Sequence, residues 1–255
     1  MRALTATVVR NEPLVRSLMR LTLAAGPLAS ALPGQCVAVP RPSALSIVAH
    51  PFPLASFDTR AGTAALLYDG DEAVASWLAL LPPGTALDLL GPWGRPFPID
   101  GRARHVLLLG TGTRLLGLLA LASALVDGGV AVVVLHDAPT ATALVPPALL
   151  PPAAEYHVAT ADGTAGMRGT ALDLLPPLLP WADALYATLP AGAYLTLRDL
   201  VYRQRLRLRR GFATVLADAP LACYAAACAG CAVPLRDGYG LLCKDGPAFD
   251  LLELA

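Results

Sequence analysis

Charged residues are scarce in this sequence, and lysine is almost missing from it. Only 15% of the 255 residues are charged, Lys plus Arg and Asp plus Glu balance at 19 each, and Lys244 is the single lysine. Proteins that bind nucleic acid through its phosphates usually carry a basic excess, so the composition excludes that class. The 55% hydrophobic content indicates a folded protein rather than a disordered one.

The sequence also lacks a clean apolar run of the kind that marks a secretion signal or a membrane span. The N-terminal residues have no apolar stretch of the signal-peptide kind. The most apolar window, residues 106–126, is long enough to cross a bilayer but is interrupted by Gly110, Gly112 and Gly117. A buried strand, a turn and a helix fit this punctuation better than a spanning helix. We therefore expect a cytoplasmic protein without a membrane span.

Cysteine is sparse and unevenly distributed. Of the five cysteines, four lie in the last 33 residues, whereas Cys36 stands alone. A disulfide framework spreads its cysteines along a small secreted domain, so this clustering instead indicates a metal site in a reducing compartment. Cys36 is interpreted as a small core residue without a functional role.

The first 100 residues predict a small β-barrel. Short apolar runs with partial alternation are separated by Gly, Pro and Asp, at residues 8–10, 16–23, 35–39, 63–68 and 86–90. Many short strands with turn signals between them are typical of a barrel. Residues 73–81 have a more helical pattern.

Residues 101–218 predict a parallel α/β domain. His105–Leu109 is a continuous apolar run, as in a strand that is buried on both faces. A glycine turn, an expected helix over residues 115–126 and an expected strand over residues 130–135 complete a βαβ unit. Further strands are expected at 156–159 and 185–189, and a helix at 193–202. The fold class is therefore β plus α/β, with residues 219–255 as a separate cysteine-bearing segment.

The four clustered cysteines have the spacing C-x4-C-x2-C-x11-C, at Cys223, Cys228, Cys231 and Cys243. Two bridged irons need two terminal thiolates each, and this spacing is that of the plant-type ferredoxin ligand run. The residues between the ligands are small, so the backbone can fold tightly and point its amides at sulfur. The pattern predicts a [2Fe–2S] cluster. A structural zinc site, which usually takes paired C-x2-C knuckles, and metal-free cysteines remain the alternatives.

Several motifs occur in an order that resembles a known family. They are Pro33-Gly34-Gln35-Cys36-Val37, Gly91-Pro92-Trp93-Gly94, Asp162-Gly163-Thr164-Ala165-Gly166, Asp237-Gly238-Tyr239 and Cys243-Lys244-Asp245-Gly246-Pro247. With the cysteine run, they resemble the iron–sulfur electron-transfer subunit of class B dihydroorotate dehydrogenase, a branch of the ferredoxin–NAD(P)+ reductase-like family. The resemblance extends over nearly the whole chain and is most specific at the C-terminus.

The resemblance implies a fold and a function for each part. Residues 1–100 are expected to form an FAD-binding-type barrel, residues 101–218 an NAD-binding-type domain, and residues 219–255 the [2Fe–2S] segment. Electrons are expected to pass between NAD, FAD and the cluster and the flavin of a partner dihydroorotate dehydrogenase catalytic subunit, a step of pyrimidine biosynthesis. The chain is then an oxidoreductase subunit in a hetero-oligomer, with no catalytic residue of its own assigned.

The resemblance also implies which residues meet the flavin. The family's Arg-Pro-x-Ser motif corresponds to His50-Pro51-Phe52-Pro53, its Leu-Tyr-Arg strand to Leu67-Tyr68-Asp69, and its Gly-Thr pair to Val74-Ala75. Phe52 and Tyr68 keep an aromatic platform, whereas the arginines and the serine of the family pattern are replaced. An acid at position 69 repels a diphosphate.

The nucleotide side is predicted at the turn after the first α/β strand, with Gly110 and Gly112 as the binding residues. A single G-x-G is a weak signal, because it also serves as a tight strand-to-helix turn. The family's Cys-Gly-Pro corresponds here to Thr188-Leu189-Pro190.

Three hypotheses follow from these patterns. The chain is an electron-transfer subunit of dihydroorotate dehydrogenase, a related flavoprotein reductase for another partner, or a relay module that keeps the cluster and has lost FAD or NAD. Hydrolytic chemistry has no support, since no serine lies in a nucleophile-elbow motif.

Overall fold

The structure is a computed structural model that describes residues 2–40, 49–72, 75–204, 209–219, 221–223 and 226–255. The chain divides into two compact units. The first unit comprises Met1–Pro96, Asp218–Val233 and Gly240–Pro247, and the second comprises Phe97–Ala217, Pro234–Tyr239 and Ala248–Ala255. No helix in the described ranges is both long enough and apolar enough to cross a bilayer.

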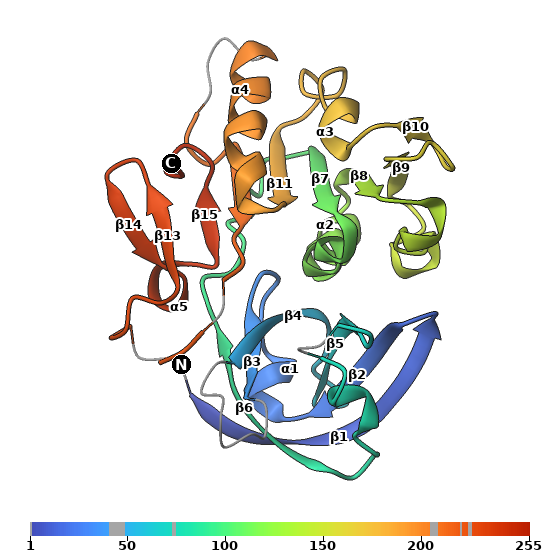
Figure 1. The fold of residues 1–255 in the computed structure, drawn as a ribbon, viewed down its shortest axis with the longest axis vertical. Helices are drawn as coiled ribbons and strands as arrows, with labels where there is room; N and C mark the ends of the chain where they lie inside the picture. Colours follow the sequence, from blue (N-terminus) through green and yellow to red (C-terminus); the bar gives the residue numbers. More distant parts are fainter. Residues whose placement is uncertain (1, 41–48, 73–74, 205–208, 220, 224–225) are drawn as a thin grey trace. The chain divides into compact units, whose positions relative to one another are not determined.

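The first unit contains a closed antiparallel barrel, which confirms the barrel prediction (Figure 1). Around the barrel its strands follow the order β1-β2-β5-β4-β3-β6. Their bounds are β1 Ala3–Val15, β2 Leu18–Ala24, β3 Cys36–Pro40, β4 Ala49–Asp58, β5 Thr63–Asp69 and β6 Ala86–Trp93. A short helix, α1 (Gly26–Ala29), lies between β2 and β3 in sequence.

The barrel closes because alternate residues of its strands are apolar and point inward. Along β6, for example, Leu87 and Leu89 are buried whereas Ala86 and Asp88 are exposed. Leu21, Leu54 and Leu66 belong to the same core and are at most 1% exposed. Burying one such side chain contributes about 1.5–3 kcal/mol, so the alternation fixes the strand register as well as the stability.

One expectation for this unit was wrong, and one strand was not anticipated. In the described part of residues 73–81, the structure has a single 3-10 turn, Leu78–Leu80, rather than a helix. Pro82 and Pro83 follow the turn and cannot continue it, and the side chain of Asn11 donates hydrogen bonds to the carbonyls of Leu78 and Leu81, at 2.7 and 3.0 Å. Strand β4 was not expected, because Pro51 and Pro53 weaken the strand signal. Tertiary pairing with β3, from Ala49 to Pro53, overrides that local preference.

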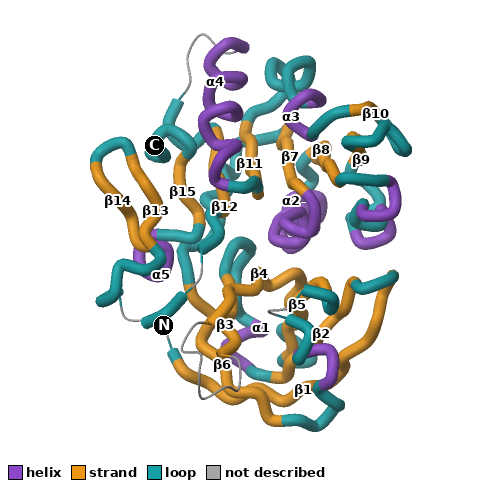
Figure 2. Tube along the Cα trace, viewed as in Figure 1, coloured by secondary structure: helices purple, strands orange, loops and turns teal. Residues whose placement is uncertain are grey.

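The second unit contains a mostly parallel sheet of the order β10-β9-β8-β7-β11-β12-β15 (Figure 2). Only β15 runs antiparallel to its neighbour. The bounds are β7 His105–Thr111, β8 Ala131–Ala138, β9 Glu155–Thr160, β10 Met167–Arg168, β11 Ala184–Thr188, β12 Ala213–Leu216 and β15 Ala248–Asp250. The helices are α2 (Leu119–Asp127), α3 (Ala171–Leu174) and α4 (Tyr194–Gln204).

The order in which the chain adds strands to the sheet reverses beside β7. From β7 the chain adds β8 and β9 on one side and then β11 and β12 on the other. In open α/β sheets, ligands bind outside the carboxyl ends of the strands at such a switch point. The expected helix over residues 115–126 begins as a 3-10 segment, Gly112–Leu118, and becomes α-helical only at Leu119. Short 3-10 turns are frequent at helix N-termini.

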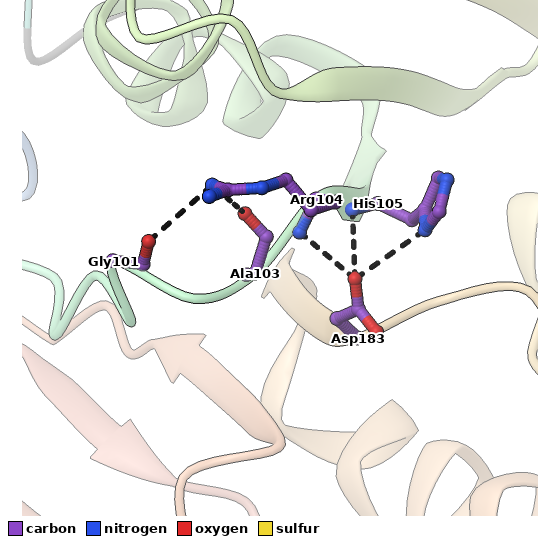
Figure 3. A network of polar contacts seen from close by, with 5 residues as sticks. All are labelled: Gly101, Ala103, Arg104, His105 and Asp183. Carbon is purple, nitrogen blue, oxygen red and sulfur yellow. Dashed lines mark hydrogen bonds and ion pairs between the residues drawn. The ribbon is translucent and has the colours of Figure 1, made fainter.

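The carboxylate of Asp183 holds the amino ends of β7 and β11 together (Figure 3). Asp183 accepts hydrogen bonds from the backbone N–H groups of Arg104 and His105, at 2.8 and 2.9 Å. The ring of His105 lies 3.4 Å from the same carboxylate. These N–H groups lower the pKa of Asp183, the N–H of Arg104 most of all.

Candidate functional site

The four clustered cysteines all belong to the first unit. Cys223 and Cys243 are half-buried, Cys231 is buried and Cys228 is exposed. Cys223 and Cys228 lie in loop, Cys231 directly precedes β13 (Ala232–Leu235), and Cys243 lies on α5 (Leu242–Asp245) after β14 (Gly238–Leu241). The hairpin β13–β14 returns the fourth cysteine toward the first three, and Leu242 N–H donates to the carbonyl of Cys231 at 3.0 Å.

The backbone of this segment points its amides at sulfur. Cys223 Sγ accepts from the N–H groups of Ala227 and Cys228, at 3.4 and 3.3 Å, and Cys228 Sγ accepts from Gly230 N–H at 3.3 Å. Ala226 and Ala229 adopt left-handed φ values of 57° and 53°. Such conformations cost energy in non-glycine residues and concentrate at functional sites, so the loop is shaped around its thiols at a local cost.

The thiols interact with one another. Burial, then the thiols of Cys231 and Cys223, raise the pKa of Cys243 to about 11, while Ala226 N–H opposes that rise. Cys231 and Cys243 also share a side-chain hydrogen bond. Bound iron would favour the thiolate form of these cysteines, because its positive charge would offset the repulsion between neighbouring thiolates.

The donor set fits an iron–sulfur cluster. Four thiol groups and amides directed at sulfur are the groups that such clusters use. Among the described residues, no three His, Cys, Asp or Glu side chains form a set that could hold one metal ion. The contacts between thiols and amides involve Cys223, Ala227, Cys228 and Gly230, and a bridged core takes its ligands in two pairs.

The cysteine segment is anchored to the barrel by two backbone junctions. Ala49, at the start of β4, exchanges two backbone hydrogen bonds with Leu221, at 2.8 and 3.0 Å. Arg95 N–H donates to the carbonyl of Gly246 at 2.8 Å. A Cβ added to Gly94, whose φ is +95°, would overlap the ring of Pro247. The Gly91–Gly94 loop therefore packs against the turn that follows Cys243, which explains the glycine at position 94.

The residues expected to meet the flavin lie on two strands of the barrel. His50, Pro51, Phe52 and Pro53 belong to β4, and Leu67, Tyr68 and Asp69 end β5. The rings of Phe52 and Tyr68 meet edge to face, with centroids 6.4 Å apart. Both are core residues, 8% and 3% exposed. The pair therefore forms part of the barrel interior, and burial raises the pKa of Tyr68 to about 12.

The hydroxyl of Tyr68 is used within the fold. It donates to Asn11 Oδ1 at 2.9 Å, and Asn11 in turn binds the carbonyls of the 3-10 turn. Asp69 accepts the N–H of Asp71 at 3.0 Å, so this turn presents Asp69, Asp71 and Glu72 together. Ala75 is fully buried, and Val74 lies outside the described residues. The assignment of these residues to a flavin stays a prediction.

At the turn that is predicted to bind the nucleotide, Gly110 and Gly112 have different structural roles. A Cβ on Gly110 would lie 2.7 Å from the Leu115 Cα, so this glycine permits close packing of β7 on the following turn. Gly112 has φ +54° and open space where a Cβ would stand. Its carbonyl oxygen lies 3.1 Å from Nε2 of His136, a residue of the adjacent strand β8.

Polar groups gather at the carboxyl ends of the neighbouring strands, and of these sequence reasoning singled out Thr188 but missed His136 and Asp137. His136 is fully buried, Asp137 has one carboxylate oxygen on Ala171 N–H at 2.9 Å, and Thr188 is paired in register with Gly110. The second oxygen of Asp137 and the hydroxyl of Thr188 are buried without a hydrogen-bond partner. The signal was available, because each of these residues ends a predicted parallel strand.

Comparison with known proteins agrees with this arrangement. Residues 220–255 match the family described as iron–sulfur cluster binding domain of dihydroorotate dehydrogenase B. The dihydroorotate dehydrogenase B (NAD(+)) electron transfer subunit of Geobacillus thermodenitrificans is 30% identical over 254 residues, covering 95% of each chain. The chain belongs to this family. The subunit of the same name from Bacillus caldolyticus is 31% identical, over 85% of this chain and 84% of its own.

Solved structures support the fold of this electron transfer subunit family. The structure of NADH-dependent reduced ferredoxin-NADP oxidoreductase superimposes with a TM-score of 0.82 at 23% identity, covering 98% of this chain and 89% of that one. An Amycolatopsis cytochrome P450 reductase superimposes with a TM-score of 0.67 at 22% identity, covering 83% and 68%. The ferredoxin reductase-like fold expected from the sequence is confirmed.

Proposed function

We propose that this chain is the electron transfer subunit of a dihydroorotate dehydrogenase B complex, with its cluster on Cys223, Cys228, Cys231 and Cys243. The observation that carries the proposal is the loop 223–231, in which backbone amides point at cysteine sulfur in a segment that matches the family's cluster domain. Free thiols persist in a reducing compartment, so the proposed location is the cytoplasm.

When bound, the cluster supplies one-electron transfer, FAD converts hydride pairs into single electrons, and NAD supplies hydride chemistry. The four cysteines hold the iron. The N–H groups of Ala227, Cys228 and Gly230 withdraw electron density from the sulfurs and stabilise the reduced, more negative state. The exposed Cys228 leaves one edge of the site open to a partner.

The proposed flavin site uses β4 and the end of β5, and the proposed nucleotide site uses the Gly110–Gly112 turn. His50 and Pro51 are half-buried on β4, so their side chains reach the barrel surface while Phe52 packs inward. At the sheet switch point, Gly112 leaves open space beside its backbone, which is what close approach of a diphosphate requires.

The test is assembly with a flavin-containing dihydroorotate dehydrogenase catalytic subunit. We expect the two chains to co-purify, and dihydroorotate added anaerobically to the complex to bleach the visible absorbance of the cluster. Dihydroorotate added to this chain alone is the control and should bleach nothing. Stable association with a different flavoprotein, and none with this catalytic subunit, would overturn the assignment in favour of a related reductase.

A second candidate, a cluster-bearing relay without FAD, is favoured by one specific observation. The turn that ends β5 carries Asp69, Asp71 and Glu72. Neither position 50 nor position 69 has the arginine of the family pattern. A chain purified with iron and sulfide but without flavin, and that takes up no added FAD, would establish this second function.

A further inference from the structure

One buried histidine is not accounted for by the family motifs. His136 lies near the carboxyl end of β8, is 0% exposed, and contacts the glycine turn at the end of β7. Its Nε2 lies 3.1 Å from the carbonyl oxygen of Gly112. Because a carbonyl oxygen can only accept, Nε2 must carry the proton and donate.

The other side of the ring is held as well. Nδ1 lies 2.6 Å from the hydroxyl of Tyr156 on β9, and that hydroxyl lies 2.8 Å from the carbonyl of Val145. The two rings are stacked, 5.9 Å apart with an angle of 18° between their planes. Burial lowers the pKa of His136, which favours the neutral ring with its single donor at Nε2. Nδ1 then accepts the one proton of the Tyr156 hydroxyl, so that hydroxyl does not also donate to the carbonyl of Val145. The orientation of the ring is therefore fixed from both sides.

Gly112 begins the 3-10 segment Gly112–Leu118 and has no side chain to pack it against the fold. Its φ of +54° is left-handed, and a Cβ at this position would meet no atom within 4 Å. Packing holds Gly110 instead, through Leu115. A glycine without side-chain packing samples many backbone conformations, so a fixed carbonyl determines which way its peptide faces.

We propose that His136 is a positioning residue for the nucleotide, which pins the Gly112 peptide so that the open side of the turn can receive the diphosphate of NAD. This inference rests on the proposed use of the Gly110–Gly112 turn for NAD. Tyr156 acts indirectly, because it orients the ring of His136, and that ring orients the Gly112 peptide.

The test compares four variants of the full chain. His136→Leu removes the donor, His136→Gln keeps an amide donor near the Nε2 position, and Tyr156→Phe removes only the hydroxyl behind the ring. His157→Leu, on the next strand, is the matched control because its side chain is 46% exposed and its ring lies 3.3 Å from the Glu155 carboxylate, away from Gly112 in the hydrogen-bond pattern of the described residues. NADH binding is measured by fluorescence titration, and amide hydrogen exchange is measured over residues 110–114.

We expect His136→Leu to weaken NADH binding about tenfold, as loss of one oriented hydrogen bond does, and to speed amide exchange in the turn. His136→Gln should recover most of the affinity, and Tyr156→Phe should lose about threefold, less than His136→Leu. On the assembled complex, the KM for NADH should rise while kcat changes little. His157→Leu should leave both readouts unchanged.

The two ways to fail are distinguishable. If the wild type binds NADH and His136→Leu binds it equally well, the positioning role is wrong and the proposed function stands. If the wild type binds no NADH, the nucleotide part of the proposed function fails, and amide exchange alone decides the role of His136 in the turn. Unchanged exchange in His136→Leu would then overturn the proposal.

Discussion

The four clustered cysteines and the strands β4 and β5, where the flavin site is proposed, belong to the same unit, yet they retain their family pattern to different degrees. In the segment, all four thiols are present, and three of the amides that meet sulfur come from Ala227, Cys228 and Gly230. On β4 and β5, the aromatic pair is present but buried, and an acid replaces the cation. The ligands of a cluster come from one local segment, whereas the contacts to a flavin come from side chains on several strands. Substitutions therefore remove a flavin site more easily than a cluster site.

The largest expected effect comes from removing a cluster ligand. Cys228→Ser should abolish the visible cluster absorbance, because a serine oxygen is a poor substitute for a thiolate on iron. Absorption spectra of anaerobically purified protein would show it. Cys36→Ser is the control, since Cys36 is 2% exposed in the barrel and burial raises its pKa. Equal loss in both variants would show that the ligand assignment is wrong.

The next effect tests whether the cluster depends on the barrel. Gly94→Ala places a Cβ against Pro247 and should lower the free energy of unfolding by about 2–4 kcal/mol, with a matching fall in iron content. Gly84→Ala is the matched control. Gly84 has a similar φ of +87° with open space around it, so it should cost only about 1 kcal/mol. Urea unfolding and iron analysis measure the two quantities, and equal costs would contradict the packing argument.

A smaller effect is expected from restoring the flavin side. Asp69→Asn removes a negative charge and should tighten FAD binding about three- to tenfold, while the amide oxygen can still accept the N–H of Asp71. Asp58→Asn is matched, because Asp58 also accepts backbone N–H groups, from Arg60 and Ala61, at the other end of β4. Flavin fluorescence titration reports the affinity. The double change His50→Arg with Pro53→Ser should tighten binding further, and no response in any variant would place the flavin elsewhere.

The smallest effect concerns the second unit. The pKa of Asp183 is lowered by the N–H groups of Arg104 and His105, so its contribution to stability is present above the unfolded-state value of about 3.9 and disappears as the pH falls through the folded-state value. Asp183→Asn should cost less than about 1 kcal/mol at pH 7, since the carboxylate is 46% exposed. Urea unfolding at pH 7 and at pH 3 should show the difference shrinking. A constant difference would contradict the account.

Much of the architecture could be predicted from the sequence. Continuous apolar runs at His105–Leu109 and the glycines after them indicated the parallel sheet, because the signal is contained in the strand itself. Strand β4 could not be predicted in this way, since Pro51 and Pro53 hide it and only pairing with β3 reveals it. The helix expected near residues 73–81 does not continue because Pro82 and Pro83 follow it and have no N–H groups to donate, and the carbonyls of Leu78 and Leu81 are satisfied by Asn11, far away in sequence.

The candidate sites show the same division. The spacing of the cysteines predicts four ligands, and the hairpin β13–β14 lies between the third and the fourth of them in sequence, while their role as ligands stays a prediction. His136 and Tyr156 could not be paired from the sequence, since the contact depends on the register of β8 against β9. The burial of Phe52 and Tyr68 likewise depends on barrel closure, which is a property of the whole unit.

The central claim is tested most directly by measuring iron, acid-labile sulfide and flavin on one anaerobically purified sample. The account predicts two irons and two sulfides per chain, as a [2Fe–2S] cluster requires. One FAD beside them makes the chain a complete electron transfer flavoprotein, and none makes it the cluster-bearing relay. Zinc in place of iron, or no sulfide, would contradict the account.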